Sequence, residues 1–237
     1  MMRLNDPELV RRQYETEAGL AVRRDSQLRF LEGANAFDVA LEAVMAARPG
    51  RVLEVGCGMG DFAERVVGEV GAHVVATDLS TRMVELTRGR GLDARVADVQ
   101  DLPFADGEFD CAVANWMLYH VPDLDRALGE LHRVLRPGGT LVATTIGVEH
   151  MADVWELVAF GVPMREFSRE SGEELLRRHF GRVERRDVDA TIVFPDEAAV
   201  HRYVESTVFA DAVPRPLPSI EGAFRSRTRT TVFVAER

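Results

Sequence analysis

A glycine-rich turn is the first feature of this sequence whose residue types could do chemistry. Gly56, Gly58 and Gly60 follow the apolar run 52–55 and precede a helical pattern that begins after residue 60. Glycine lets a ligand approach the backbone closely, and the first turn of a helix offers free N–H groups and a positive dipole end. The pattern therefore predicts a ligand-binding bend, although a plain strand-to-helix turn would use the same glycines.

Three polar residues stand where the following predicted strands end. Asp78 follows the predicted strand 73–77, Asp98 follows 94–97, and Asn115 follows 111–114. Each of them alone could cap a helix or form a turn. The carboxyl ends of parallel strands meet at one edge of an open sheet, where such sheets bind ligands. Together with the glycine turn, the three residues predict a cleft at that edge.

The elements that must position these residues follow an alternating pattern. Short apolar runs alternate with amphipathic helical stretches, which favours parallel strands joined by helical crossovers. The predicted strands are 52–55, 73–77, 94–97, 111–114, 140–145, 188–194 and 230–235. We therefore predict an α/β fold with a doubly wound, Rossmann-like, mostly parallel seven-stranded sheet. Outside the central alternation, helices are predicted at 7–23, 151–160, 168–178 and 196–209.

Composition and charge exclude several kinds of chemistry. The chain has 237 residues, a net charge of −10 and 29 basic residues, all of them arginine. The absence of lysine excludes a Schiff base and a lysine-dependent phosphate loop, and the acidic balance disfavours nucleic acid as a partner. The two cysteines lack metal-ligand spacing and are too few for a disulfide framework, so we expect no metal.

The expected location is the cytoplasm. No apolar run approaches the roughly 18 residues of a membrane span, and two cysteines suit a reduced compartment. We therefore expect no membrane partner. The oligomeric state stays open, a homodimer included.

Four motifs resemble class I S-adenosylmethionine-dependent methyltransferases of the group that acts mostly on small molecules. They are Leu-Glu-Val-Gly-Cys-Gly-Met-Gly at 53–60, Ala-Thr-Asp-Leu-Ser at 76–80, Ala-Asp-Val-Gln-Asp-Leu-Pro-Phe at 97–104 and Leu-Arg-Pro-Gly-Gly-Thr-Leu at 135–141. Their order and spacing resemble that family across residues 37–146. An NAD dehydrogenase also uses a glycine turn, but its third glycine would fall where this chain has Asp61.

The resemblance implies S-adenosylmethionine as the cofactor, together with a set of contacts to it. The backbone of Gly56, Cys57 and Gly58 would pass under the methionine part, with Glu54 organising the turn. Asp78 would accept hydrogen bonds from the two ribose hydroxyls. The other implied contacts are Asp98 and Val99 at the adenine, Asn115 at the methionine, and Leu79 and Met83 beside the nucleoside.

The resemblance also implies a division of the chain. Residues 1–36 would form an N-terminal helical lid, in which Tyr14 would lie over the cofactor or else pack in the core. Residues 37–237 would form the methyltransferase domain, including a small C-terminal cap insertion. The acceptor-side cap segments would lie near 147–167 and 195–222, since loop-rich additions often carry specificity.

The expected reaction is methyl transfer to an oxygen, nitrogen or carbon atom of a small-molecule metabolite, by in-line displacement at the sulfonium methyl. His120 is the first candidate for a general base and His150 the second, although either could be structural. A protein or RNA methyltransferase and a noncatalytic S-adenosylmethionine-binding module are the alternatives. Three arginines could meet an anionic acceptor or pair with nearby glutamates: Arg165, Arg169 and Arg202.

Overall fold

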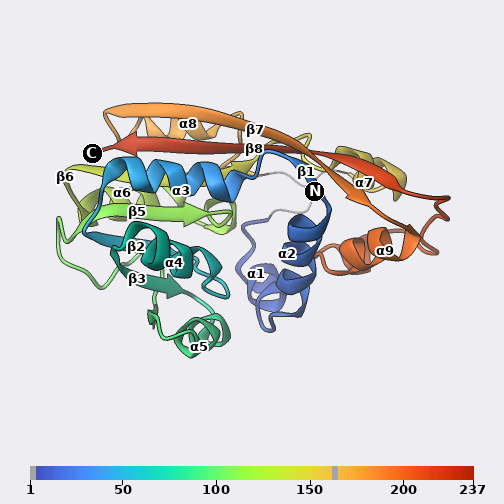
Figure 1. Cartoon of the computed structure of the whole chain (residues 1–237), viewed down its shortest axis with the longest axis horizontal. Coiled ribbons are helices and arrows are strands. Elements are labelled where there is room, and N and C mark those ends of the chain that lie inside the picture. Colours follow the sequence, from blue (N-terminus) through green and yellow to red (C-terminus); the bar gives the residue numbers. More distant parts are fainter. Residues whose placement is uncertain (1–3, 162–164) are drawn as a thin grey trace.

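A single mixed sheet runs through the computed structural model, which describes residues 4–161 and 165–237 (Figure 1). Its strands are β1 (Leu31–Gly33), β2 (Arg51–Val55), β3 (His73–Asp78), β4 (Asp93–Val96), β5 (Phe109–Asn115), β6 (Leu135–Ile146), β7 (Arg182–Phe194) and β8 (Phe224–Glu236). The order across the sheet is β1-β7-β8-β6-β5-β2-β3-β4. The chain order reverses between β2 and β5, so the glycine turn after β2 lies at the switch point of the topology.

One half of the sheet is parallel and the other is antiparallel. β4, β3, β2, β5 and β6 run parallel, as predicted. β8 lies antiparallel between β6 and β7, and β1 pairs antiparallel with β7. The prediction of a seven-stranded sheet was therefore wrong by one strand. Leu31–Gly33 has only three residues, one charged and one glycine, and its extended form depends on pairing with β7.

Helices cover both faces of the sheet, which makes it doubly wound (Figure 1). One face carries α3 (Ala36–Ala47), α4 (Asp61–Arg65) and α5 (Thr81–Gly89), and the other carries α6 (Leu124–Val134) and α8 (Gly172–Leu176). The remaining helical elements are α1 (Pro7–Gln13), α2 (Ala18–Phe30), α7 (Ala152–Leu157), α9 (Glu197–Glu205), the π-helix Val66–Val70, and the 3₁₀ turns Leu118–His120 and Ala210–Ala212.

The core is divided by the sheet. Leu53 and Val55 belong to the apolar cluster under α6, whereas Val52 belongs to the cluster under α3, because successive side chains of a strand point to opposite faces. Both faces are covered, so β2 is buried from residue 52 onward and is apolar there except at one position. Glu54 is the one charged residue in that buried stretch.

The N-terminal and C-terminal elements differ from the prediction in length. The helix predicted over 7–23 is two helices, α1 and α2, separated by the turn 14–17, although Asp6 caps α1 as expected. α7 and α8 are shorter than predicted. β7 and β8 are longer, because the charged half of each strand pairs with the more apolar half of the other: 182–187 with 231–236, and 225–229 with 189–193. Within the two described ranges, no helix is long and apolar enough to span a bilayer.

Candidate functional site

The glycine turn adopts the backbone conformation for which glycine is suited. Gly56, Gly58 and Gly60 have φ values of +68°, +54° and +81°, a region that side-chain-bearing residues rarely occupy. A Cβ atom at Gly56 would lie 2.7 Å from the Cβ of Met117. The N–H of Cys57 donates to the carbonyl of Thr77 at 2.9 Å. The bend is therefore held against the end of β3.

Asp78 is hydrogen-bonded directly to this bend. Its Oδ2 accepts from the Gly58 N–H at 3.0 Å and its Oδ1 from the Ser80 N–H at 2.9 Å. Burial raises the pKa of Asp78, although the backbone N–H groups counteract the rise. The structure thus brings together two of the predicted site features, the second glycine and the acid that ends β3.

Glu54 is a second buried carboxyl group beside the bend. Its side chain is 3% exposed, and Oε2 has no hydrogen-bond partner within residues 4–161 and 165–237. Burial, followed by the negative charge of Asp78, raises its pKa well above the ordinary value. Glu54 and Asp78 are neighbouring acids, and the Oε2 of Glu54 lacks a hydrogen-bond donor within the described ranges. This environment favours the binding of a cation or of a hydrogen-bond donor.

Asn115 ends β5 on the other side of β2. Its Oδ1 accepts from the Thr144 Oγ1 at 2.6 Å, which leaves Nδ2 buried and without an acceptor in the described part of the chain. The edge therefore holds an unsatisfied acceptor on Glu54 and an unsatisfied donor on Asn115. A ligand that carries both an ammonium and a carboxylate group would satisfy the two atoms.

The predicted adenine contacts lie at the adjoining strand end. The Ala97 N–H donates to the carbonyl of Asp78 at 3.1 Å, which places the residues before Asp98 directly beside Asp78. Asp98 itself accepts from the backbone and side-chain N–H groups of Gln100, at 2.8 to 3.1 Å. Among the other predicted contacts, Leu79 is 61% exposed, whereas Met83 and Val99 are buried.

The N-terminal helices cover the carboxyl edge (Figure 1). The Ser80 Oγ donates to the carbonyl of Tyr14 at 2.9 Å, and Arg82 pairs with Glu17 at 2.8 Å. A Cβ atom at Gly58 would lie 3.2 Å from the Cδ2 of Leu20. The turn between α1 and α2 is therefore a direct neighbour of the glycine bend and of the end of β3.

Tyr14 also contacts His120, the first candidate base. Its hydroxyl lies 3.1 Å from the His120 Nε2, and the His120 Nδ1 lies 2.9 Å from the carbonyl of Leu4. A carbonyl only accepts, so Nδ1 carries the proton and Nε2 accepts from the Tyr14 hydroxyl. Burial, together with the charges of Arg23 and Arg165, lowers the pKa of His120 to about 4. The imidazole is neutral at pH 7.

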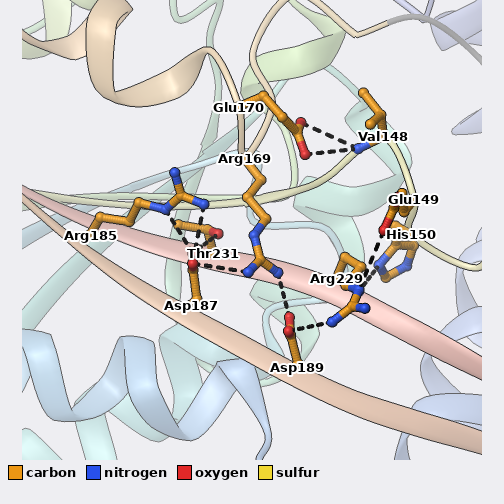
Figure 2. Close-up of polar contacts among 10 residues, drawn as sticks. All are labelled: Val148, Glu149, His150, Arg169, Glu170, Arg185, Asp187, Asp189, Arg229 and Thr231. Carbon is orange, nitrogen blue, oxygen red and sulfur yellow. Dashed lines mark hydrogen bonds and ion pairs between the residues drawn. The ribbon is translucent and has the colours of Figure 1, made fainter.

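His150 occupies a different environment, in the turn after β6. Its Nδ1 accepts from the backbone N–H of Arg229 at 3.1 Å and thereby joins this turn to β8 (Figure 2). Burial and the charge of Arg165 lower the pKa of His150 to about 3. Because one ring nitrogen holds the turn against β8, the geometry gives His150 a structural function, and its predicted catalytic role stays a prediction.

The three cap arginines have different surroundings. Arg169 pairs with Asp187 at 2.9 Å and also with Asp189, in a surface network that includes Arg185 and Arg229 (Figure 2). Of the two alternatives, surface ion pairing describes Arg169, and its partners are aspartates of β7 rather than glutamates. Arg202 is exposed, whereas Arg165 is half-buried and its charge acts on both candidate histidines.

Arg23 is a site residue that the sequence reasoning missed. It lies on α2, its Nη1 donates to the carbonyl of Ser206, and its charge acts on Tyr14 and His120. A weak signal was present in Gly19, four residues earlier, where a Cβ atom would lie 2.7 Å from the carbonyl oxygen of Ser206. That glycine leaves room for α2 to approach the end of α9.

Comparisons with known proteins find similarity to methyltransferases. The family model described as a methyltransferase domain matches residues 53–143. The chain is 34% identical over 131 residues to a ubiquinone/menaquinone biosynthesis C-methyltransferase of Vibrio cholerae, covering 49% of this chain and 50% of that protein. It is 36% identical over 126 residues to a malonyl-[acyl-carrier protein] O-methyltransferase of Pseudescherichia vulneris, covering 51% and 50%. The chain thus matches about half the length of these curated relatives.

The fold of the chain as a whole is shared with solved structures. One of them, described as an S-adenosylmethionine-dependent methyltransferase of Thermotoga maritima, has a TM-score of 0.61 and 22% identity over 95% of this chain and 99% of that one. At this identity the likeness concerns the fold alone. The methyltransferase domain model covers residues 53–143, and the solved structure shows that the shared fold extends over nearly the whole chain.

Proposed function

We propose that this protein transfers the methyl group of S-adenosylmethionine to an oxygen, nitrogen or carbon atom of a small-molecule metabolite. The observation that carries the proposal is the pair of carboxyls, the buried Glu54 and the half-buried Asp78, beside a glycine bend that a side chain would obstruct. The two relatives named above are a C-methyltransferase and an O-methyltransferase, so they leave the acceptor atom open. The net charge of −10 supports a small acceptor over nucleic acid.

The methionine part of the cofactor fits the unsatisfied atoms of the edge. Glu54 Oε2 would accept from the ammonium group and Asn115 Nδ2 would donate to the carboxylate. The backbone of Gly56, Cys57 and Gly58 would pass beneath that part. Burial of these groups in a low-dielectric environment strengthens each charged contact.

The nucleoside would extend along the neighbouring strand ends. Asp78 would accept from the ribose hydroxyls, since an ionised carboxylate accepts several hydrogen bonds. Asp98 and Val99 would lie at the adenine edge. The exposed Leu79 and the buried Met83 would flank the nucleoside, and the exposed fraction of Leu79, 61%, leaves apolar surface there to cover.

The protein's own contribution to the reaction is to position the acceptor and exclude water. Bound S-adenosylmethionine supplies a methyl group on a sulfonium whose sulfur is a good leaving group. The turn 14–17 and helices α1 and α2 act as a lid over the edge, as their contacts with Ser80 and Arg82 support. Segments near 147–167 and 195–222 would form the acceptor-side cap, with residues 162–164 of the first lying outside the described residues. Holding the reactants in line in a closed site is worth several orders of magnitude in rate.

His120 would receive a proton late in the reaction. Its Nε2 holds a lone pair in the interior, directed at the Tyr14 hydroxyl. A base with a pKa of about 4 is too weak to ionise an ordinary hydroxyl or amine beforehand. Methylation makes the acceptor's own proton far more acidic, and an acceptor that displaces the Tyr14 hydroxyl would pass that proton to Nε2.

A labelled-methyl assay tests the proposal. The full chain is incubated with methyl-labelled S-adenosylmethionine and, separately, with small-molecule, RNA and protein fractions of a cell extract. We expect label in the small-molecule fraction, none with Asp78→Ala, and a product mass that identifies the acceptor atom. Label in RNA or protein would support a macromolecule methyltransferase, and cofactor binding without transfer would support a noncatalytic module. Either result would refute the proposal.

A further inference from the structure

A cavity of about 230 Å³ opens between the end of α1 and the segment that follows α9. Its lining residues are Arg12, Gln13, Ser206, Thr207, Val208 and Asp211. The first two belong to the part of the chain that the proposed function assigns to the lid, and the other four belong to the acceptor-side cap. The cavity therefore lies at the junction between lid and cap.

Direct contacts join the lid and the cap beside this cavity. Arg23 on α2 donates from Nη1 to the carbonyl oxygen of Ser206. A Cβ atom at Gly19 would lie 2.7 Å from the same oxygen, so α2 approaches the end of α9 as closely as a glycine permits. Ser206 thus both lines the cavity and anchors α2, and a packed junction bounds the cavity on that side.

Gln13 brings an unpaired hydrogen-bond acceptor to the lid wall. Its Oε1 is buried and has no hydrogen-bond partner within residues 4–161 and 165–237. Leaving a buried amide oxygen without a donor is costly, and buried polar atoms are normally paired. A ligand that donates a hydrogen bond in the cavity would remove this cost.

The cap wall adds two hydroxyl groups whose protons are already used. The Ser206 Oγ donates to the carbonyl of Tyr203 at 2.7 Å. The Thr207 Oγ1 donates to the carbonyl of Val204, also at 2.7 Å. The oxygen of each hydroxyl can still accept a hydrogen bond but has no further proton to donate. The polar groups of the cap wall therefore complement a donor, as the Gln13 Oε1 does.

Charge and size narrow the kind of ligand further. Arg12 and Asp211 are exposed and carry opposite charges, so the lining has no net charge that would select an anion. A pocket that encloses a whole small-molecule ligand has a volume of roughly 300 to 1,000 Å³. At about 230 Å³ this cavity suits one substituent of a larger molecule.

The end of α1 also reaches the candidate base. Gln13 is the last residue of α1, and Tyr14 is its C-cap. The Tyr14 hydroxyl lies 3.1 Å from the His120 Nε2. Neighbouring side chains diverge by about 100° around a helix axis, which allows Gln13 to line the cavity while Tyr14 contacts the base. A molecule held against Gln13 would therefore lie beside the part of the lid that contacts His120.

We propose that this cavity is a subsite for a hydrogen-bond-donating substituent of the acceptor, a hydroxyl or an ammonium group, and that Gln13 selects that substituent. The proposal rests on the proposed function and adds a specificity-determining residue to it. An analogue without the donor leaves the buried Gln13 Oε1 unpaired. Sites built around a hydrogen bond reject close analogues in this way.

A saturation experiment with matched variants tests the proposal. The full chain is assayed for labelled-methyl transfer with increasing amounts of the small-molecule fraction of the extract. Gln13→Leu should raise the half-saturating amount of that fraction about tenfold, the equivalent of one lost hydrogen bond, with the plateau rate within about twofold of the wild type. Gln27→Leu makes the same change at a half-buried glutamine of α2 outside the lining, and it should behave as the wild type does.

Gln13→Glu distinguishes the two donor groups. It keeps an acceptor oxygen at this position and adds a negative charge. A half-saturating amount below that of the wild type indicates an ammonium group, because opposite charges attract. An equal or higher amount indicates a hydroxyl group, provided that Gln13→Leu raises it as expected. Circular dichroism confirms that each variant is folded.

Thermal unfolding supplies a readout that requires no turnover. With the protein saturated with S-adenosylhomocysteine, the small-molecule fraction should raise the melting temperature of the wild type and of Gln27→Leu. It should raise that of Gln13→Leu less, because a ligand stabilises the folded state according to its affinity. The cofactor analogue is present throughout, so the shift reports binding outside the cofactor site.

The outcomes separate this inference from the function on which it rests. Transfer by the wild type, with the half-saturating amount and the thermal shift unaffected by Gln13→Leu, would overturn the inference and leave the function in place. An equal effect of Gln27→Leu would also overturn it. If the wild type transfers no methyl group, the proposed function is wrong, and the thermal shift still decides whether Gln13 binds a small molecule.

Discussion

Acid sensitivity provides a quantitative test of the His120 environment. The pKa of His120 is about 4 in the folded protein, against 6.5 for an ordinary histidine. Above pH 6.5 the ring is neutral in both states and contributes nothing. Between pH 6.5 and about pH 4, the unfolded chain takes up a proton that the folded protein does not. The free energy of unfolding therefore decreases as the pH is lowered through this range. One pKa unit is worth about 1.4 kcal/mol, which makes the loss about 2.5 kcal/mol between about pH 7.5 and about pH 4.5.

The perturbation is His120→Gln, which removes the titrating ring from this environment. Urea unfolding at about pH 7.5 and about pH 4.5 measures the free energy of unfolding of both proteins. The variant is expected to lose about 2.5 kcal/mol less than the wild type over this interval. His73→Gln, at an exposed position, is the matched control and should follow the wild type. Equal losses for wild type and His120→Gln would refute the buried, neutral histidine.

Three further predictions follow from the bend, the surface network and the thiols. Gly56→Ala should destabilise the protein by about 1 to 3 kcal/mol and weaken cofactor binding, because the φ of Gly56 is +68° and the new Cβ would meet Met117. The control is Gly68→Ala, where the space around the glycine is open. It should leave the melting temperature unchanged or raise it. Arg169→Gln should lower the melting temperature by a few degrees, because it removes two ion pairs from a side chain that is 17% exposed. The effect should be smaller at high salt, which screens the ion pairs. An unchanged melting temperature would contradict this. Burial raises the pKa of Cys57 and raises that of Cys111 to about 12. Both thiols should therefore resist alkylation until urea unfolds the chain. Rapid modification of the native protein, seen by mass spectrometry, would contradict this prediction.

The parallel half of the fold was predictable because local patterns determine it. Buried strands covered on both faces read as nearly continuous apolar runs, as in β2, and their order along the chain places Asp78, Asp98 and Asn115 at one edge. The hydrogen bond from Gly58 to Asp78 is a consequence of that placement. The resemblance then supplied the roles of these residues, which local patterns alone do not distinguish.

The antiparallel half and the interior arginines were not predictable in the same way. β1 is a strand only because β7 pairs with it, and the charged halves of β7 and β8 are strands because each pairs with the more apolar half of the other strand. Tyr14 caps the end of α1 and Arg23 lies within α2, so both are far from His120 in the chain. Contacts of this kind depend on tertiary packing, which no local window of sequence contains.

Calorimetric titration of the purified full chain with S-adenosylmethionine tests the carboxyl-edge site most directly. Asp78→Ala removes the acid that holds Gly58 and Ser80 and should weaken binding roughly 100-fold or more, since hydrogen bonds to a charged group are worth about 1.5 to 3 kcal/mol each. Asp93→Ala, which removes a surface acid paired with Arg95 on neighbouring β4, should bind as the wild type does. Equal affinity of wild type and Asp78→Ala, or no binding by the wild type, would contradict the assignment of this edge to the cofactor.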